Sequence, residues 1–253
     1  MKYTVITGAS SGIGYETALA FAARGKNLII AARRTAELEK LKSKVANLNQ
    51  DLDVVIRTVD LSVTANVYEF YESLQNYQIE TWINNAGFGN FASVGEQNVK
   101  RMETMLRLHI EALTVLSTLY VRDYADVEGT QIINISSGGG YQIVGNAVTY
   151  CASKFYVSAF TEGLAQELKE KGSPMQVKVL APASTETEFI KNALDLDEFH
   201  YEGVVPNYHT AKEMAGFMLD LYDSKEVVGI VNGKTYEFEL RGPIYPYVAR
   251  TRN

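Results

Sequence analysis

Short apolar runs alternate with longer segments of helical periodicity along almost the whole chain, and this alternation restricts the fold more than any other feature of the sequence. Several of the short runs are almost entirely apolar, as expected for strands that are covered on both faces. Strands and helices that alternate through right-handed crossovers build a parallel sheet between two layers of helices. The sequence therefore predicts an α/β fold, a doubly wound parallel sheet in a three-layer sandwich. The runs expected as strands are residues 3–7, 27–31, 54–59, 81–84, 131–135, 176–180 and 227–231, and the helical stretches include residues 12–24, 35–50, 99–124 and 150–171.

No long linker and no internal repeat divides the chain, so we expect a single domain over residues 1–253. The hydrophobic fraction of 46% is enough for a sizeable core. Acidic residues outnumber basic ones by 30 to 24, which disfavours a partner such as nucleic acid, because binding its phosphates needs a concentrated basic face. A small-molecule ligand is the expected partner instead.

The chain has one cysteine, Cys151, and three widely separated histidines, which is not the spacing of a zinc site, so we expect no metal. No histidine stands near Cys151 in the sequence to activate it, and we expect it to be a packed core residue. The few apolar residues before the first glycine turn are too short for a signal peptide, and no run approaches the roughly 20 apolar residues that span a bilayer. We expect a cytoplasmic protein without a membrane partner.

A glycine-rich turn separates the first expected strand from the first helix and reads Thr7-Gly8-Ala9-Ser10-Ser11-Gly12-Ile13-Gly14. Glycines at this position let the backbone turn tightly and approach a pyrophosphate, whose charge is met by the N-terminus of the helix. The turn is typical of a Rossmann-type dinucleotide site. The candidate pyrophosphate-binding residues are Gly8, Ser10, Ser11, Gly12, Ile13 and Gly14.

Two arginines follow the second expected strand, at the place where NAD-selective folds carry an acid for the ribose 2′-hydroxyl. Arg33 and Arg34 stand there, and no acid occurs before Glu37. Because guanidinium groups bind phosphate by charge and by forked hydrogen bonds, the sequence predicts NADP(H) in preference to NAD(H), with Arg33 the stronger candidate. Asp60, after the third strand, has two open roles: a hydrogen bond to adenine, or a cap for the next helix through Ser62.

Tyr150 and Lys154 are four residues apart and share one face of an expected helix. A positive charge close to a phenol favours the phenolate, and lowering a tyrosine pKa by about 3 units takes about 4 kcal/mol, which Lys154 and an oxidised nicotinamide ring could supply together. Tyr150 would then exchange a proton with substrate oxygen. Ser137, which follows the fifth strand, is placed to hydrogen-bond the same oxygen.

These motifs together resemble the short-chain dehydrogenase/reductase family, in its short, non-extended form. Ser137 precedes Tyr150 by 13 residues, as the family's serine usually does, and the resemblance covers nearly the whole chain. It implies that a hydride passes between a nicotinamide and a carbonyl or secondary alcohol. Further residues take roles only through this resemblance. Asn84, Asn85, Ala86 and Gly87 resemble the turn that braces the sheet and borders the adenosine ribose, Tyr150 and Lys154 would also hold the nicotinamide ribose, and Pro182 and Thr187 resemble the loop beside the nicotinamide and the phosphates.

The chain departs from the family pattern at two positions. His109 stands where the family usually has the asparagine of a proton relay that starts at the lysine. It could keep the helix geometry or titrate itself near pH 6.5, or it could be a hydrogen-bonded core histidine. Ala183 replaces the glycine of the Pro-Gly loop and could narrow the nicotinamide side of the pocket.

Residues 185–207 mix aromatic, aliphatic and acidic side chains and are expected to form a lid over the substrate. With Phe88, Phe91, Tyr141 and Gln142 the lid would line a largely apolar pocket. The expected helix over residues 99–124 is apolar on more than one face and would serve the core or a subunit contact, so a homodimer or homotetramer is expected.

The predicted function is an NADP(H)-dependent oxidoreductase that acts on a hydrophobic carbonyl or hydroxy compound. Two alternatives remain open at this point: a 3-oxoacyl-thioester reductase, and a binding protein that senses NADP(H) without turnover, for which His109 is the sequence support.

Overall fold

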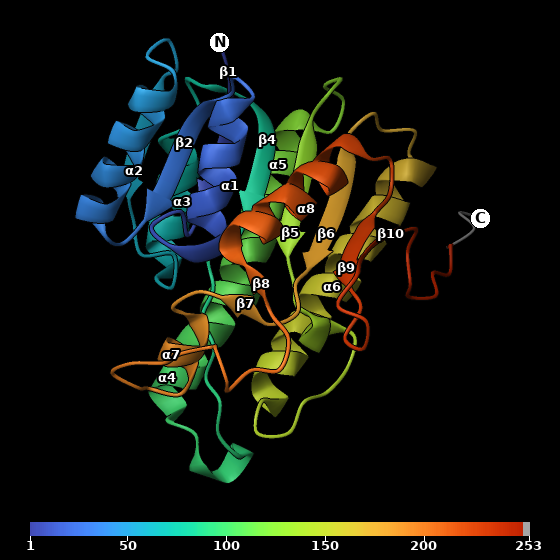
Figure 1. Ribbon diagram of the computed structural model, residues 1–253. Helices are drawn as coiled ribbons and strands as arrows, with labels where there is room; N and C mark the ends of the chain where they lie inside the picture. The colour runs from blue at the N-terminus through green and yellow to red at the C-terminus, as the bar shows by residue number, and fades with distance from the viewer. Residues whose placement is uncertain (250–253) are drawn as a thin grey trace.

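A sheet of eight strands forms the middle layer of the computed structural model, which describes residues 1–249 (Figure 1). The strands follow one another in the order β10-β9-β6-β5-β4-β1-β2-β3. The order reverses between β1 and β4, and in such sheets ligands bind in the crevice at the carboxyl ends of these strands. The strands are β1 (Lys2–Thr7), β2 (Asn27–Ala32), β3 (Val54–Thr58), β4 (Gln78–Asn84), β5 (Gln131–Ile135), β6 (Gln176–Ala181), β9 (Val228–Val231) and β10 (Phe238–Arg241).

The last strand corrects the prediction of an all-parallel sheet. The strands from β3 across to β9 pair in parallel, whereas β10 runs antiparallel to β9 at the edge. Its sequence, FELR, alternates apolar and charged residues in only four positions. Charged side chains are common on exposed edge strands, where they prevent pairing with another chain. Because they interrupt the apolar run, such a strand is difficult to predict from hydrophobicity alone.

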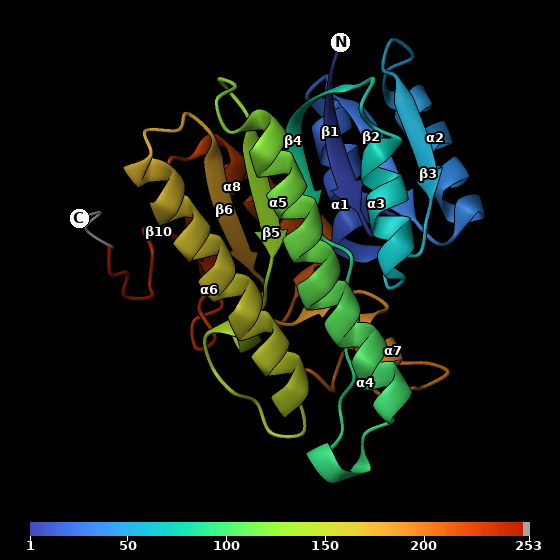
Figure 2. The same cartoon turned by 180° about the vertical axis from the view of Figure 1, so that it is seen from behind.

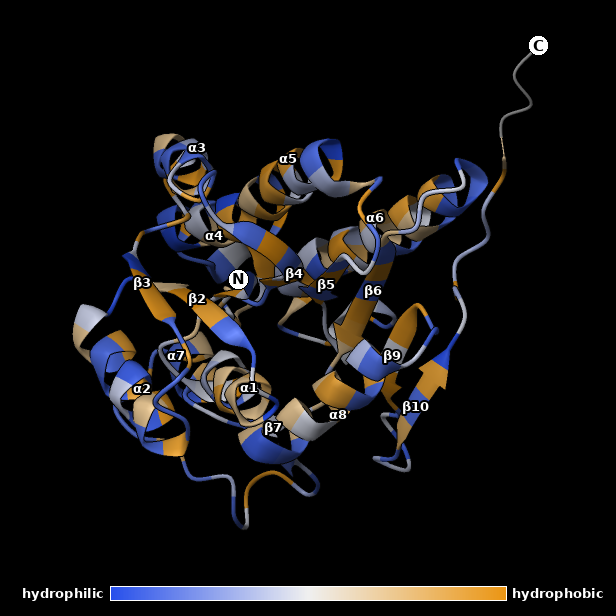
Figure 3. Ribbon diagram, turned by 90° about the horizontal axis from the view of Figure 1, so that it is seen from above, coloured by the Kyte–Doolittle hydropathy of each residue, from blue (hydrophilic) through white to orange (hydrophobic). Residues whose placement is uncertain are grey.

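Two layers of helices cover the sheet (Figures 2 and 3). Helices α1 (Gly12–Ala23), α2 (Thr35–Leu48) and α8 (Ala211–Asp223) pack on one face, and α3 (Thr64–Glu72), α5 (Leu113–Tyr124) and α6 (Val148–Glu170) on the other. The apolar core is accordingly split into two clusters of buried side chains, one under each layer. Trp82 and Tyr120 are the largest fully buried side chains, and both belong to the cluster under α3, α5 and α6. The predicted doubly wound three-layer sandwich is confirmed.

The expected helix over residues 99–124 is interrupted in its middle. Helix α4 (Val99–Leu106) passes into a π-helical turn (Arg107–Ala112) before α5 begins. A π-helical turn inside an α-helix often marks a functional site. His109, the residue that departs from the family pattern, lies within this turn.

The segment expected as a lid has some regular structure of its own. Strand β7 (Thr185–Glu186) pairs in parallel with β8 (His209–Thr210), and the short helix α7 (Phe189–Ala193) lies between them. Figure 1 shows α7 beside α4, below the carboxyl ends of the sheet strands. No helix within residues 1–249 is both long and apolar enough to cross a membrane.

Candidate active site

The glycine turn after β1 has the backbone that a nucleotide cradle requires. Gly8 and Gly12 have φ angles of +69° and +57°, which side chains other than glycine rarely adopt. At Gly14 the reason for glycine is space, because a Cβ there would lie 2.3 Å from Nδ2 of Asn85 and 2.6 Å from the carbonyl oxygen of Gly8. The turn leads straight into α1, whose N-terminus therefore faces the crevice.

Hydrogen bonds join this turn to the segment after β4. The Thr7 hydroxyl accepts from the backbone N–H groups of Asn85, at 3.0 Å, and Ala86, at 3.1 Å. The Asn85 amide in turn donates to the carbonyl oxygens of Thr7, at 2.9 Å, and Gly8, at 3.2 Å. The structure thus brings residues 7–14 and 84–87 together at the switch point of the sheet.

A chain of buried amides braces the neighbouring strand ends. The Asn84 side chain donates to Oδ1 of Asn134 and to the Ser117 hydroxyl, and it accepts from the Trp82 indole. Asn134 continues the chain by donating to the Thr161 hydroxyl. The brace at Asn84 was implied by the family resemblance. Asn134 was not predicted, although a polar residue inside the apolar run of β5 is a signal for such a role.

The two arginines after β2 differ in their surroundings. Arg33 is exposed and donates no side-chain hydrogen bond to any residue from 1 to 249. Arg34 donates to the Ser10 hydroxyl at 3.3 Å and to both carboxylate oxygens of Glu188, at 2.9 and 3.4 Å. This ion pair lowers the pKa of the Glu188 carboxyl. Both arginines stand beside the glycine turn, as the prediction requires, but Arg34 is already paired with the start of α7.

Asp60 bonds to Ser62 in the loop before α3 and does not itself cap the helix, whose N-cap is Val63. Its Oδ1 accepts from the backbone N–H of Ser62 at 3.0 Å and from the Ser62 hydroxyl at 2.7 Å. Asn66 donates to the Asp60 carbonyl oxygen, which ties the loop to α3. The alternative contact with adenine stays a prediction.

The three residues proposed for catalysis meet at the carboxyl ends of β5 and β6. Tyr150 and Lys154 lie on α6 and are both buried, and the Lys154 ammonium is 5.9 Å from the centre of the Tyr150 ring. Ser137 begins the short helical turn Gly138–Gly140, where its hydroxyl accepts from the Gly139 N–H at 3.0 Å. A Cβ on Gly139 would lie 3.4 Å from the Ser137 hydroxyl and 3.5 Å from the Tyr150 ring, so these groups are close neighbours.

The electrostatics of the tyrosine are dominated by burial. Burial raises the pKa of Tyr150 to about 12, and a hydrogen bond with the Ser137 hydroxyl opposes only part of that rise. Burial also lowers the pKa of Lys154 to about 7, and its ammonium donates to the Ile135 carbonyl oxygen at 2.9 Å. Without a nicotinamide, desolvation therefore disfavours both charged forms. The lowering of the phenol pKa by Lys154 together with a bound oxidised nicotinamide stays a prediction.

Aromatic rings from two other segments enclose the tyrosine. The ring centres of Phe91 and Phe189 lie 5.4 and 5.6 Å from that of Tyr150, and those of Phe91 and Phe189 lie 6.0 Å apart. The apolar surroundings expected from Phe91 and the lid are present. Tyr141, however, donates to the buried carboxylate of Glu162 and stacks on Tyr245, so its side chain is committed to the C-terminal segment instead of the predicted pocket.

His109 is fully hydrogen-bonded inside the core. Its Nε2 accepts from the Phe88 N–H at 3.2 Å, which assigns the ring proton to Nδ1, 2.9 Å from the Ser153 hydroxyl. Ser153 donates in turn to the Tyr150 carbonyl oxygen at 2.7 Å. Burial and the nearby Lys154 charge hold the pKa of His109 well below its usual value. Of the roles that the sequence left open for His109, these contacts favour a hydrogen-bonded core histidine over a histidine that titrates near neutral pH.

The loop after β6 packs on the glycine turn. A Cβ on Gly12 would lie 3.0 Å from Cγ2 of Thr187, and the Pro182 carbonyl oxygen accepts from the Gly138 N–H at 2.7 Å. Ala183 packs against the larger core cluster, and Cys151 is buried, as expected for a packed residue. Gly139 and Gly140 were not predicted as residues of the site. A Cβ on Gly140 would lie 2.3 Å from the Ser136 hydroxyl, so only glycine fits there. The run of three glycines after Ser137 was the available signal.

Comparison with known proteins gives consistent matches. Residues 2–197 match the family described as short chain dehydrogenase. A Staphylococcus saprophyticus protein described as an uncharacterized oxidoreductase is 29% identical over 81% of this chain and 85% of its own length. The human protein named dehydrogenase/reductase SDR family member 11 is 27% identical over 78% of each chain.

Solved structures agree with the fold. A short-chain dehydrogenase from Sphingobium yanoikuyae in complex with NADPH superposes with a TM-score of 0.84 at 28% identity, covering 93% of this chain and 89% of that one. The bulky-bulky ketone specific alcohol dehydrogenase from Comamonas testosteroni gives a TM-score of 0.79 at 28% identity, covering 91% of this chain and 86% of that one.

Proposed function

The chain belongs to the short-chain dehydrogenase/reductase family and is a nicotinamide-dependent oxidoreductase, and from this premise we propose that it is an NADP(H)-dependent carbonyl reductase. The proposed substrate is a hydrophobic small molecule with a carbonyl group, or the corresponding secondary alcohol. One observation carries the proposal: Tyr150, Ser137 and Lys154 gather at the carboxyl ends of the strands, and Phe91 and Phe189 enclose the tyrosine.

The residues at the switch point fit a dinucleotide. The turn packs closely on its neighbours, since a Cβ at Gly12 would meet Thr187 and one at Gly14 would meet Asn85, so only glycine lets the backbone take this tight course into α1. When bound, NADP(H) supplies or accepts the hydride. The exposed guanidinium of Arg33 supports a preference for the 2′-phosphate, and the Sphingobium relative is described with NADPH. The residues that would hold the cofactor are Gly8, Ser10, Ser11, Gly12, Ile13, Gly14, Arg33, Arg34, Asp60, Asn85, Ala86, Gly87, Tyr150, Lys154, Pro182 and Thr187.

The protonation states support the direction of carbonyl reduction. With its pKa raised to about 12, the Tyr150 phenol keeps its proton at neutral pH and can donate it to a substrate oxygen. The Ser137 hydroxyl positions that oxygen. Lys154, with a pKa of about 7, gains or loses a proton near neutrality and can return one to the site. His109 holds Phe88 and α6 in place and thereby keeps the two walls of the site together.

A carbonyl screen tests the reaction. Purified protein is mixed with NADPH and a panel of ketones, aldehydes and 3-oxoacyl thioesters, and NADPH oxidation is followed by absorbance. We expect turnover of at least one hydrophobic ketone and loss of turnover in Tyr150→Phe, which should still bind NADPH. Turnover confined to the thioesters would favour the 3-oxoacyl-thioester reductase, and NADPH binding without turnover on any carbonyl would favour a sensing protein.

Cofactor choice needs a separate measurement. We expect Arg33→Ala to weaken NADPH binding about 10-fold or more while NADH binding changes little, because only NADPH carries the 2′-phosphate. The matched control is Arg24→Ala, whose guanidinium pairs with Asp223 away from the crevice. Tighter binding of NADH than NADPH by the unaltered protein would contradict the proposed preference.

We also propose a homo-oligomer that uses the outer face of α5 and α6. Tyr156 stacks on Phe160 on α6, its hydroxyl bonds to Thr114 of α5, and 36% of Tyr156 stays exposed. Light scattering should give a mass of two or four chains, and Tyr156→Glu should lower it; a monomer in both cases would contradict the proposal.

A further inference from the structure

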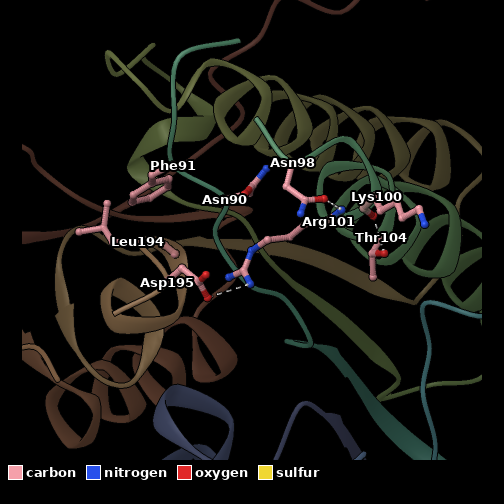
Figure 4. A pocket seen from close by; sticks show the side chains of 9 residues that line it. Asn90, Phe91, Asn98, Lys100, Arg101, Thr104, Leu194 and Asp195 are labelled. Carbon is pink, nitrogen blue, oxygen red and sulfur yellow. Dashed lines mark hydrogen bonds and ion pairs between the residues drawn. The ribbon is translucent and has the colours of Figure 1, made fainter. Parts of the chain in front are cut away.

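A hollow of about 430 Å³ lies next to the enclosed tyrosine, between the start of α4 and the end of α7 (Figure 4). One of its lining residues is Phe91, whose ring also contacts Tyr150. The Phe91 ring thus lies between the hollow and the proposed catalytic group, with Phe189 packed against it and against Tyr150. None of the roles assigned above uses the polar side chains of this hollow.

The charges around the hollow are mainly positive. Lys100 and Arg101 supply two cations, and Asp195 is the one carboxylate among the lining residues. The Asp195 side chain is 94% exposed, and its oxygen lies 3.8 Å from Nη1 of Arg101, so water screens most of its effect. The lining residues therefore carry a net charge of about +1, which suits a monovalent anion such as a carboxylate better than a phosphate dianion.

The Arg101 guanidinium is held in place before any ligand arrives. Its Nη2 donates to the carbonyl oxygens of Gly89 and Asn192, and the group lies 5.5 Å above the Phe88 ring. Fixing a long side chain in advance reduces the entropy that binding would otherwise cost. The remaining edge of the guanidinium, with Nη1, has only the long contact to Asp195 within the described part of the chain.

A second observation points to a ligand. Asn90 lines the hollow and is 6% exposed, yet its Nδ2 donates to no group among residues 1–249. Figure 4 shows Asn90 between Phe91 and Asn98. Leaving a buried amide N–H unpaired costs about 1–3 kcal/mol. Because Nδ2 has almost no accessible surface, an acceptor in the hollow removes that cost when the Asn90 side chain turns toward it.

We infer that this hollow binds the carboxylate of a substrate whose carbonyl group reaches Tyr150. The substrate class is thus a hydrophobic oxo acid, or the hydroxy acid formed from it. In the reaction the carbonyl carbon gains a hydride from the nicotinamide cofactor, the carbonyl oxygen gains a proton from Tyr150, and the carboxylate is unchanged. This inference rests on the proposed function, which it narrows to one substrate class.

Matched pairs of substrates test the inference. Aryl oxo acids with spacers of different length are compared with their methyl esters, which differ only in charge. We expect kcat/KM to be at least about 10-fold higher for the acid of the best pair. Arg101→Gln should lower kcat/KM for that acid about 10- to 100-fold and leave the ester nearly unchanged. Arg107→Gln, six residues further along and paired with the exposed Glu103, is the matched control and should change neither.

The same experiment separates a structural role of Arg101 from a binding role. If Arg101 only ties α4 to α7, acid and ester lose activity together, and that result would overturn the inference. Asn90→Leu gives an independent check, because it removes the unpaired amide: we expect weaker binding of the acid without loss of stability. An unchanged acid affinity in Asn90→Leu and Arg101→Gln would also overturn it.

Binding measurements test the inference even if no carbonyl in the screen is turned over. Calorimetry on Tyr150→Phe loaded with NADPH measures acid and ester affinities without turnover. Tighter binding of the acid than of the ester, lost in Arg101→Gln, supports the hollow even if every carbonyl in the screen is inert. Equal affinities would refute the inference and leave the proposed function standing if ketones are reduced.

Discussion

The nucleotide side and the substrate side of the site are built by different interactions. On the nucleotide side, residues 7–14 and 84–87 are joined by short hydrogen bonds among part-buried backbone and side-chain groups. On the substrate side, residues 88–98 and 185–207 meet through aromatic ring edges and a backbone hydrogen bond from Phe91 to Ala193. The half-exposed ion pair of Arg34 with Glu188 joins this side to the nucleotide side. The first set of contacts is strong and directional, whereas the second is weak and screened by water.

This difference indicates which part of the site can move. Opening the nucleotide side would leave buried polar groups unpaired, so we expect it to be formed before the cofactor binds. Lifting α7 away from Tyr150 would break the aromatic contacts of Phe189 and two hydrogen bonds, from the Phe91 N–H to the Ala193 carbonyl oxygen and from Arg101 to that of Asn192. These bonds lie nearer the surface than those of the nucleotide side, so we expect the substrate side to open first. Segments that admit substrate are usually held in this weaker way.

The largest effect is expected at Lys154, where the two sides meet. Lys154→Met should lower kcat at least about 100-fold, because the site loses the amine that exchanges protons near neutrality. It should also stabilise the fold at pH 6. The folded-state pKa of Lys154 is about 7, below the ordinary value of 10.5, so the cost of its buried charge is full below pH 7 and disappears as the pH rises toward 10.5.

Urea unfolding of both proteins at pH 6 and pH 10 measures this effect. We expect Lys154→Met to gain about 1–3 kcal/mol over the unaltered protein at pH 6, after allowance for the lost bond to the Ile135 carbonyl oxygen, and less at pH 10. A variant that is equally destabilised at both pH values would show that the ammonium is not desolvated.

A pair of substitutions compares the two sides directly. Thr7→Val keeps the shape of the side chain but leaves the N–H groups of Asn85 and Ala86 without their acceptor. We expect it to cost about 2 kcal/mol of unfolding free energy and to weaken NADPH binding. Phe189→Ala should cost less than about 1 kcal/mol, because the ring is only partly buried, and should raise KM for the carbonyl substrate. Equal losses of stability would mean that the substrate side is as firmly held as the nucleotide side.

His109 connects the two sides, and its protonation should appear in the pH dependence of stability. Its folded-state pKa lies well below 6.5, so the unfolded chain binds the proton more readily and stability falls as the pH drops below 6.5. This contribution approaches about 1.4 kcal/mol per pH unit. His109→Asn should flatten the curve between pH 6.5 and 5, as measured by denaturant titration. A curve of unchanged slope would contradict the assignment of a neutral histidine.

The smallest effect is expected at Glu188, which competes with a 2′-phosphate for Arg34. Glu188→Gln should tighten NADPH binding about two- to fivefold and leave NADH binding unchanged, because exposed ion pairs contribute about 0–1 kcal/mol. Fluorescence titration of both cofactors gives the ratio. Glu186→Gln, also exposed and in the same segment, is the control. A parallel gain for NADH would show that Glu188 acts on the shared part of the cofactor.

Much of the nucleotide side could be predicted because its signals are local. The glycines and the arginines directly follow strand ends, and Tyr150 and Lys154 are one helical turn apart. The contacts that were missed join distant segments. Glu162, 2% exposed on α6, accepts from the Tyr141 hydroxyl and from the N–H groups of Ile244 and Tyr245, which lie more than 80 residues further along the chain. A local sequence pattern cannot predict hydrogen bonds between residues that are this far apart in the chain.

The order of strands, helices and motifs in the sequence was enough to predict the doubly wound, mostly parallel α/β sheet and the glycine turn after its first strand, because alternation and spacing act over a few neighbouring positions. Which groups are desolvated was decided only when distant segments packed together. Burial under Phe91 and Phe189 raises the Tyr150 pKa, and the meeting of α4 with α7 creates the hollow that holds Arg101 and Asn90. Charge and burial at a site depend on the whole set of neighbours, and those come from all parts of the chain.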